Sequence, residues 1–485
     1  MTLGRNARRR LLQAVPLLLL LACALVLFIG ADDGELFFRI NKSIDLFGKV
    51  YREIALQHVD DTDPERLMHA GIDGMLEGLD PYTVFLDDRE SDEIDLVTTG
   101  RYGGIGVSIG VRDGAVVIVN LMEGLSASRQ GLAIGDRLIE VEGSAVSTLS
   151  PEEIRRLVRG APGTEVRLKI QREGETAPLD FVLVREDIRV RNISYSGLVE
   201  SGIGYIRLDR FSRTAGEDVR VALKELKTAG PLRGVILDLR DNPGGLLDMA
   251  VEVVSAFVPE SSFVVSTKGR RPESERRYLS VQQPLTPDLP LAVLVNGNSA
   301  SASEIVAGAV QDLDRGIVVG TRTFGKGLVQ TVSRLTETAS LKITTARYYT
   351  PSGRCIQMLD YAHRGKDGSA QAVPDSLRKT FSTRNGRTVT EAGGILPDSV
   401  IMAPDAGPLV VGLVRKAMFF KYAGAMAVRS RLDSTTQVTD RTLADFERFL
   451  DSTGFRYEED TEEALRALRL LAQESRYERG FFNGL

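Results

Sequence analysis

The sequence predicts a protein of several domains, with α/β and α+β regions between helical segments at both ends. Strand and helix patterns alternate from Gly202 to Ile343, an order typical of an α/β layer. A glycine-rich section with β-branched residues precedes this layer from Gly100 onward. Apolar residues recur at helical spacing before Leu79 and after Pro408. The length of 485 residues suits about three domains.

Composition excludes several classes of protein. An apolar fraction of 43% with 26% charged residues is ordinary for a globular protein. The 61 basic and 66 acidic residues give a net charge of −5, so we expect no nucleic-acid partner. Cys23 and Cys355 are too few for a disulfide framework. We expect no metal ion and no cofactor.

Residues 1–31 are predicted to anchor the chain in the cytoplasmic membrane. Arginines precede a predominantly apolar run without charged residues, Leu11–Ile29, which as a helix would span about 28 Å of a bilayer core about 30 Å thick. The positive flank predicts that the rest of the chain is exported to the periplasmic or extracytoplasmic side. A cleavable signal ending near Ala22-Cys23-Ala24 is the alternative. The run is longer than the apolar core of a usual signal sequence, which favours the anchor.

Residues 32–97 are predicted to form an N-terminal helical region. Apolar residues recur at three- and four-residue steps from Phe37 to Leu79. Asp63-Pro64-Glu65 is typical of a helix start, with an N-cap aspartate and a proline at the first helical position.

The glycine-rich section, residues 98–187, contains an ordered set of turns, strands and a helix. These are the loop Gly104-Ile105-Gly106-Val107 before an apolar strand, a Gly135-Asp136 turn, the predicted helix Pro151–Arg159 and the predicted strand Val166–Ile170. Together they resemble a PDZ domain. Glycine lets consecutive N–H groups point at an anion, and an extended peptide can add to the strand edge. The resemblance implies that Gly104, Ile105, Gly106 and Val107 hold the C-terminal carboxylate of a substrate.

A first strand-to-helix turn is a candidate for stabilising negative charge. The predicted strand Leu232–Leu239 runs into Asn242-Pro243-Gly244-Gly245, and the predicted helix Leu246–Val258 follows. Glycines at a helix start expose N–H groups and a positive dipole end. A plain turn between a strand and a helix is the alternative.

Two further turns contain a serine and a lysine. The predicted strand Leu291–Val295 ends in small residues around Ser301, with a helix to Val310, and the predicted strand Ile317–Gly320 leads to Lys326 between two glycines. Alone, the serine would be an ordinary helix cap. A phosphate-binding lysine is excluded because the pattern that surrounds one is absent.

The three histidines are poorly placed to serve as a base for this serine. His58 and His69 lie in the predicted N-terminal helices, and His363 lies in a polar stretch. A serine without a histidine needs another base, and serine–lysine pairs are a known variant of the catalytic triad.

Together these motifs resemble the carboxy-terminal processing peptidases, also called tail-specific proteases. The resemblance rests on segments around Asp238–Gly245, Ser299–Ile305, Gly320–Gln330, Tyr349–Arg354 and Gly394–Asp398. It implies a crotonase-like peptidase core over residues 188–404 with an inserted PDZ domain. It also implies roles for individual residues: Ser301 as nucleophile, Lys326 as general base, Gln330 orienting the lysine, and the N–H groups of Gly244 (or Gly245) and Ala302 as the oxyanion hole.

Two regions depart from the family pattern. Residues 360–392 are predicted to be an insertion or an exposed loop, and residues 405–485 a C-terminal helical extension.

The expected partners are proteins with exposed C-terminal tails, together with the membrane through the N-terminal segment. A homo-oligomer and an activator protein both stay open. A non-catalytic PDZ scaffold is an alternative function, and acyl-CoA chemistry on a crotonase-like fold is another; the Ser301 and Lys326 pair argues against both. Arg159 is predicted to face out of the PDZ domain. It is either a solvated charge at a helix end or a residue that transmits tail binding to Lys326.

Overall fold

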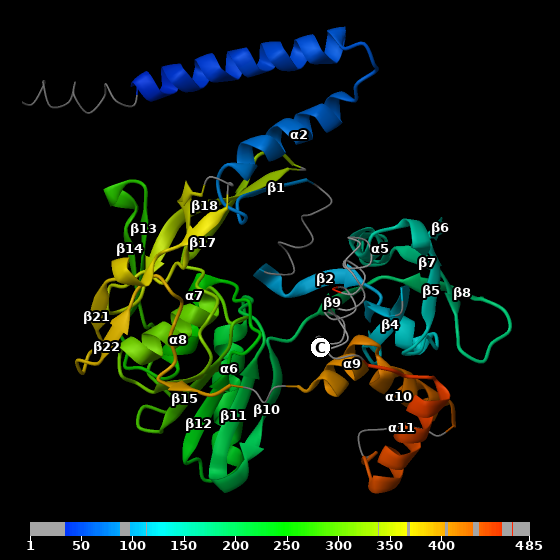
Figure 1. The fold of residues 1–485 in the computed structure, drawn as a ribbon. Coiled ribbons are helices and arrows are strands. Elements are labelled where there is room, and N and C mark those ends of the chain that lie inside the picture. The colour runs from blue at the N-terminus through cyan, green and yellow to red at the C-terminus, as the bar shows by residue number, and fades with distance from the viewer. Residues whose placement is uncertain are drawn as a thin grey trace, which may run out of the picture. The chain divides into compact units, whose positions relative to one another are not determined.

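The computed structural model describes residues 34–87, 98–112, 114–337, 339–365, 369–402, 406–429, 436–457 and 468 (Figure 1). The predicted membrane anchor, residues 1–31, lies outside the described residues. Among the residues that are described, no helix is both long and apolar enough to cross a membrane.

The N-terminal region is helical, as its spacing predicts. Residues 34–57 form one helix and α2 (Pro64–Glu77) a second. The Asp63 carboxylate accepts from the N–H of Glu65 at 2.9 Å, with Pro64 in the first turn, which confirms the predicted helix start. β1 (Val84–Leu86) follows, and the residues up to Phe85 form a compact unit with Leu341–Ile343.

The predicted PDZ domain contains an antiparallel sheet in the order β3-β4-β5-β7-β8, with β6 paired to β5. β3 therefore lies at an edge of this sheet. The helix α5 (Pro151–Val158) begins at a capping box between Ser150 and Glu153. The strands are β2 (Arg101–Gly104), β3 (Val107–Arg112), β4 (Ala115–Leu121), β5 (Arg137–Val141), β6 (Ser144–Ala145), β7 (Glu165–Gln171), β8 (Leu179–Val184) and β9 (Glu186–Arg189), the last paired with β2.

The core sheet has the order β10-β11-β12-β15-β16-β23 and is parallel from β11 onward. Its strands are β10 (Ile193–Val199), β11 (Ile203–Leu208), β12 (Gly234–Asp238), β15 (Leu291–Val295), β16 (Ile317–Gly320) and β23 (Ser399–Val400). Three helices share an apolar core with this sheet: α6 (Ala215–Ala229), α7 (Leu247–Ser255) and α8 (Ala302–Asp312) (Figure 1). Every residue of α8 is buried, because the helix lies inside the apolar core.

A second sheet follows the lysine turn. β17 (Leu328–Arg334) pairs with β18 (Ser340–Tyr349), and β18 pairs with β13 (Phe263–Gly269), which pairs with β14 (Arg276–Leu279). β17 begins two residues after Lys326, so this sheet carries the residues that follow the lysine turn.

The polar stretch at residues 360–392, predicted to be an insertion or an exposed loop, contains short strands where it is described. They form two hairpins, and Val389 is only 8% exposed. Short strands with few apolar residues give little periodic signal, which explains why these strands were not predicted. The hairpins are β19 (Leu359–Arg364) with β20 (Ala370–Ala372), and β21 (Thr380–Ser382) with β22 (Thr388–Thr390).

The C-terminal region is helical as expected where it is described. It contains α9 (Pro408–Arg415), α10 (Met418–Arg429) and α11 (Asp440–Ser452). The rest of the predicted helical extension, from residue 458 onward, lies almost wholly outside the described residues.

Candidate active site

The functional turns lie at one edge of the core sheet. β11, β12, β15 and β16 run parallel, so their carboxyl ends share this edge. Ligands of open α/β sheets bind at such an edge. The turn after β12 contains Gly244 and Gly245, the turn after β15 contains Ser301, and the turn after β16 contains Lys326. We call them the glycine turn, the serine turn and the lysine turn.

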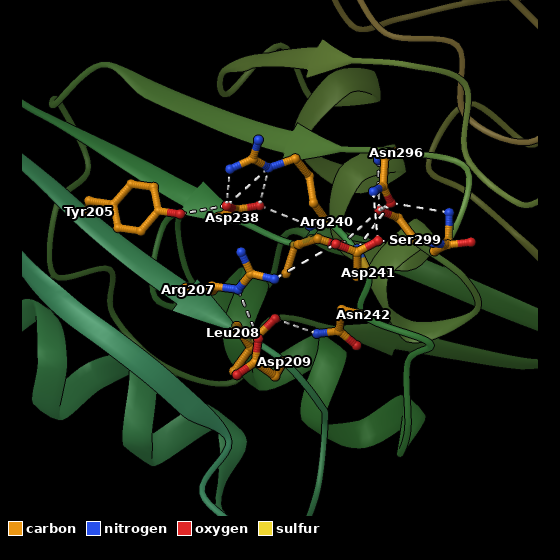
Figure 2. A network of polar contacts seen from close by, with 12 residues as sticks. Tyr205, Arg207, Leu208, Asp209, Asp238, Arg240, Asp241, Asn242, Asn296 and Ser299 are labelled. Atoms are coloured by element: carbon orange, nitrogen blue, oxygen red, sulfur yellow. Dashed lines mark hydrogen bonds and ion pairs between the residues drawn. The ribbon is translucent and has the colours of Figure 1, made fainter. Parts of the chain in front are cut away.

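A network of polar contacts fixes the turn after β12 (Figure 2). The buried Asp238 carboxylate accepts from Arg240 Nη2 at 2.6 Å and from the Tyr205 hydroxyl at 2.5 Å. Burial raises the pKa of Asp238, but the hydrogen bonds from Arg240 and Tyr205 outweigh burial and leave the pKa below its ordinary value. Three residues after Asp238, the Asp241 carboxylate accepts from Asn296 Nδ2 at 2.8 Å. The ionised Asp238 therefore holds Arg240 at the start of the glycine turn.

The glycine turn and the serine turn are bonded to each other. Ser299 Oγ donates to Leu239 O at 2.7 Å, and the Ala300 N–H donates to Asn242 O at 3.0 Å. Asn242 Nδ2 donates to Leu208 O at 2.7 Å, which ties both turns to the end of β11 (Figure 2). Asn242 and Ser299 are fully buried, where an unmade hydrogen bond is costly. The two turns are thus fixed as one unit.

Ser301 lies immediately before α8 in a strained backbone conformation. Its φ is 56° and its ψ is −114°. Residues other than glycine rarely adopt a positive φ, and such strain persists where the surroundings enforce it, often at functional sites. The position also places Ser301 at a helix N-terminus, where negative charge is stabilised.

One buried carboxylate joins the serine turn to the lysine turn. Glu304 Oε2 accepts from the N–H of Ser301 at 2.8 Å and from the N–H of Lys326 at 2.9 Å. Glu304 Oε1 accepts from the hydroxyl of Thr323 at 2.6 Å and from the N–H of Gly325 at 2.7 Å. We call these four hydrogen bonds the Glu304 clamp. The clamp brings the backbones of Ser301 and Lys326 together on one side chain.

Ionisation of Glu304 decides whether the clamp is complete. Burial raises the pKa of Glu304 to about 7, while the hydrogen bonds from Thr323, Lys326, Gly325 and Ser301 oppose this shift. When a carboxyl group is protonated, the oxygen that carries the proton becomes a hydrogen-bond donor. It then accepts hydrogen bonds from N–H and O–H groups poorly. The complete clamp therefore belongs to the ionised form of Glu304.

Tyr348 on β18 makes a second bridge between the same turns. Its hydroxyl lies 2.6 Å from Lys326 O and 3.1 Å from Ser301 O. Tyr348 is only 1% exposed, and burial raises its pKa well above the ordinary value of 10.0. The hydroxyl therefore stays protonated and can donate to these carbonyl oxygens.

Gly244 lies against the serine turn, but its N–H is already used. The Gly244 N–H donates to Asn242 Oδ1 at 2.8 Å. A Cβ on Gly244 would lie 2.7 Å from Ala300 O and 2.9 Å from the Ala302 nitrogen, and the φ of Gly244 is 100°. Only glycine fits this approach. Of the two glycines, Gly245 is the better candidate to donate to an oxyanion.

Gln330 lies on β17, close to the lysine turn. Its Nε2 donates to Thr344 Oγ1 at 3.4 Å, a long hydrogen bond. The orientation of Lys326 by Gln330 stays a prediction.

Each histidine has a local partner away from the three turns. His58 Nδ1 lies 3.2 Å from Asp60 O, His69 packs edge-on against Phe85, and His363 Nδ1 lies 2.9 Å from Asp360 Oδ2. Within the described ranges, no cluster of three or more His, Cys, Asp or Glu residues is placed to hold a metal ion.

The predicted PDZ domain has a groove between β3 and α5. The groove has a volume of about 260 Å³, and the four predicted carboxylate-binding residues, Gly104 to Val107, line it. The Ile105 and Gly106 carbonyls accept from Ala127 and Met122 within the domain, which fixes the loop. Arg159 also lines the groove and stacks on the Tyr102 ring at 4.8 Å, so the prediction that it faces out of the module is wrong.

Comparison with known proteins places these features in a family. Residues 202–361 match peptidase family S41, residues 93–171 match the PDZ domain, and residues 409–481 match the probable PDZ-protease C-terminal helical domain. The carboxy-terminal-processing protease of Bartonella bacilliformis is 39% identical over 319 residues, 65% of this chain and 73% of that protein. The chain belongs to the carboxy-terminal-processing protease family. It is a serine-type peptidase with a PDZ domain.

Other members of this family are similar to lesser degrees. The carboxy-terminal processing protease CtpA of Bacillus subtilis is 31% identical over 340 residues, 69% of this chain and 72% of that protein. Among solved structures, the photosystem II D1 C-terminal processing protease is 26% identical with a TM-score of 0.40, covering 72% of this chain and 86% of that chain.

Sequence reasoning missed two residues that shape this protease site. Glu304 could have been found, since a serine followed three residues later by glutamate is the pattern of a capping box. Glu304 also accepts a hydrogen bond from the N–H of Lys326. This contact could not be predicted from local sequence, because Lys326 lies 22 residues later, in the turn after another strand. Tyr348 likewise sits in an ordinary strand pattern and is placed only by the sheet register.

Proposed function

We propose that this protease binds the C-terminal tails of protein substrates through its PDZ domain and cleaves them with Ser301 and Lys326. The observation that best supports the pair is the Glu304 clamp, which holds the backbones of both residues on one carboxylate. Family membership supports the reaction class, peptide-bond hydrolysis by a serine.

The proposed chemistry is acyl transfer through the serine. The neutral amine of Lys326 takes the proton of the Ser301 hydroxyl as its oxygen attacks the scissile carbonyl. The protonated lysine then gives this proton to the leaving amine, which leaves an acyl group on Ser301. Water attacks the acyl group in the second half, with Lys326 again accepting and returning a proton. Gln330 orients the lysine.

The proposed oxyanion hole uses the N–H groups of Gly245 and Ala302. Gly244 was the first candidate, but its N–H donates to Asn242, whereas its neighbour Gly245 carries the next N–H of the same turn. Ala302 is the first residue of α8, so its N–H adds the positive end of the helix dipole. In this proposal Gly244 has a structural role: because it has no side chain, the glycine turn can lie directly against the serine turn.

Tail recognition is proposed at the edge strand β3. An extended tail adds antiparallel to β3, and its terminal carboxylate accepts from the N–H groups of the loop Gly104–Val107. The groove beside this loop supports the proposal.

The location proposed for the enzyme is the extracytoplasmic face of the cytoplasmic membrane, with residues 1–31 as the anchor. The proposal rests on the apolar run Leu11–Ile29 and its basic flank. Fractionation of cells that express the full chain or a chain starting at residue 34 tests it. Recovery of both chains in the soluble fraction would contradict anchoring.

Replacement of either member of the pair should abolish proteolysis without unfolding the enzyme. We expect Ser301→Ala and Lys326→Ala each to lower kcat by about 10⁴-fold or more. The measurement is cleavage of an unstructured protein with an apolar C-terminus, followed by mass spectrometry, with circular dichroism as the folding check.

A variant with both Ser301→Ala and Lys326→Ala tests whether the two residues act as one catalytic pair or contribute independently to the rate. Because the two residues act together, the double variant should be no slower than either single variant. Normal cleavage by folded Ser301→Ala enzyme would refute the assignment. Binding of tails by the wild-type chain with no cleavage would support the alternative function of a PDZ scaffold.

A further inference from the structure

The groove of the PDZ domain is apolar at the end near the glycine loop. Ile105, Val107 and Ile109 line it from β3 and the preceding loop, and Val158 lines it from α5. An aliphatic side chain is the natural occupant of such a surface. The last residue of a bound tail therefore belongs in this part of the groove.

The orientation of α5 fixes which tail residues meet which helix residues. The Gly160 N–H, just after α5, donates to Gly103 O at 3.2 Å, so the C-terminal end of α5 lies beside the glycine loop. Arg155 precedes Val158 by three residues, about 4.5 Å along the helix and away from the loop. Arg155 also lines the groove. It therefore faces tail residues that precede the last one.

The geometry of an extended tail selects one of those positions. Alternate side chains of a strand point the same way, and two residues span about 6.6 Å. When the last side chain faces α5, the side chain two residues earlier also faces α5. That side chain comes opposite Arg155.

The charge at Arg155 is available to a ligand at low cost. Arg155 Nη2 donates to Glu152 Oε1 at 3.3 Å, and the two side chains are 51% and 85% exposed. An exposed pair of this kind contributes about 1 kcal/mol or less, so another carboxylate can replace Glu152. The second arginine of the groove, Arg159, is instead stacked on Tyr102.

We propose that Arg155 is a specificity residue that selects tails with an acidic side chain two residues before an aliphatic C-terminal residue. The planar guanidinium of Arg155 pairs with the Asp or Glu carboxylate across the groove. This inference rests on the proposed recognition of tails by the PDZ domain.

The test uses the full chain with Ser301→Ala, so that bound peptides stay intact. Three fluorescent peptides all end in valine and carry Glu, Gln or Lys two residues before it. They are otherwise identical, and their affinities are measured by fluorescence polarisation. We expect the Glu peptide to bind about 3- to 10-fold more tightly than the Gln peptide, and the Lys peptide most weakly. Adding Arg155→Glu should reverse the order of the Glu and Lys peptides.

Arg156→Glu is the matched control. It makes the same change of charge on the next residue of α5, which is exposed and does not line the groove. The Arg156→Glu chain should keep the preference for the Glu peptide. An equal loss of preference in both variants would show a general charge effect and overturn the inference.

The same experiment separates failure of this inference from failure of the proposed function. If amidated and free-carboxylate peptides bind equally, or none binds, recognition of tails itself is wrong. If binding needs the free carboxylate but the ratio of Glu to Lys affinities is the same with and without Arg155→Glu, the proposed function stands and the role of Arg155 is refuted.

Discussion

Gly244 is held so closely against the serine turn that a side chain there has no space. A Cβ would lie under 3.0 Å from Ala300 O, the Ala302 nitrogen and Ser301 Cβ at once. Two of these three atoms are backbone atoms, which cannot move aside without displacing the turn. The close approach of the glycine turn to the serine turn therefore depends on this one glycine.

Gly244→Ala should lower kcat by about 10²-fold or more, because displacement of a catalytic group by about 1 Å costs that much. Steady-state proteolysis measures it. Gly174→Ala is the control, since Gly174 also has a positive φ, 88°, but open space around its Cβ position. Equal activity of the Gly244→Ala and wild-type enzymes would contradict the close approach.

At the scale of elements, the strands that carry the site were the most predictable part. The predicted strands Leu291–Val295 and Ile317–Gly320 coincide with β15 and β16, because short apolar runs bounded by glycine and polar turns define them. The pairing of β18 with β13 and β17 in the second sheet could not be predicted, since register between distant segments leaves no local pattern. For that reason the three turns were found, but the side chains that bridge them were not.

The hydroxyl of Tyr348 on β18 contacts both the serine turn and the lysine turn. Tyr348→Phe removes the hydroxyl that donates to Lys326 O at 2.6 Å and to Ser301 O at 3.1 Å. Ser301 O still accepts from the N–H groups of Glu304 and Ile305, so the main loss is the short hydrogen bond to Lys326 O. We expect a loss of about 1–3 kcal/mol of stability and a lower kcat with little change in KM. Chemical denaturation and steady-state kinetics measure the two effects.

Tyr349→Phe is the matched control, because Tyr349 is the next residue of β18 and points to the opposite face of the strand. It should leave kcat near the wild-type value. If both variants behave alike, the Tyr348 hydroxyl does not position the turns.

At the scale of the whole molecule, Glu304 links folding to pH. Its pKa is raised from 4.5 to about 7 in the folded protein, so the folded form binds this proton more tightly than the unfolded chain. The stability that Glu304 contributes is therefore present below pH 4.5 and lost as pH rises through about 7. Ionisation of a carboxyl group buried in the apolar core therefore costs stability even when four hydrogen-bond donors surround the carboxylate.

Glu304→Gln removes the titrating group while keeping its shape. The free energy of unfolding of the wild type, minus that of Glu304→Gln, should fall by roughly 3 kcal/mol between pH 5 and pH 8. Urea denaturation at several pH values, with Ser301→Ala in both chains to prevent self-cleavage, measures this difference. A difference that is constant with pH would show that Glu304 does not titrate as inferred.

The Glu304 clamp also sets an order of events while the chain is being made. Its donors come from the turn of Ser301 and from the later turn of Lys326, so the clamp can close only after synthesis has passed Lys326. Under the proposed mechanism, a chain that ends before Lys326 contains the nucleophile without its base. The proposed activity is then absent until most of the peptidase core has been synthesised.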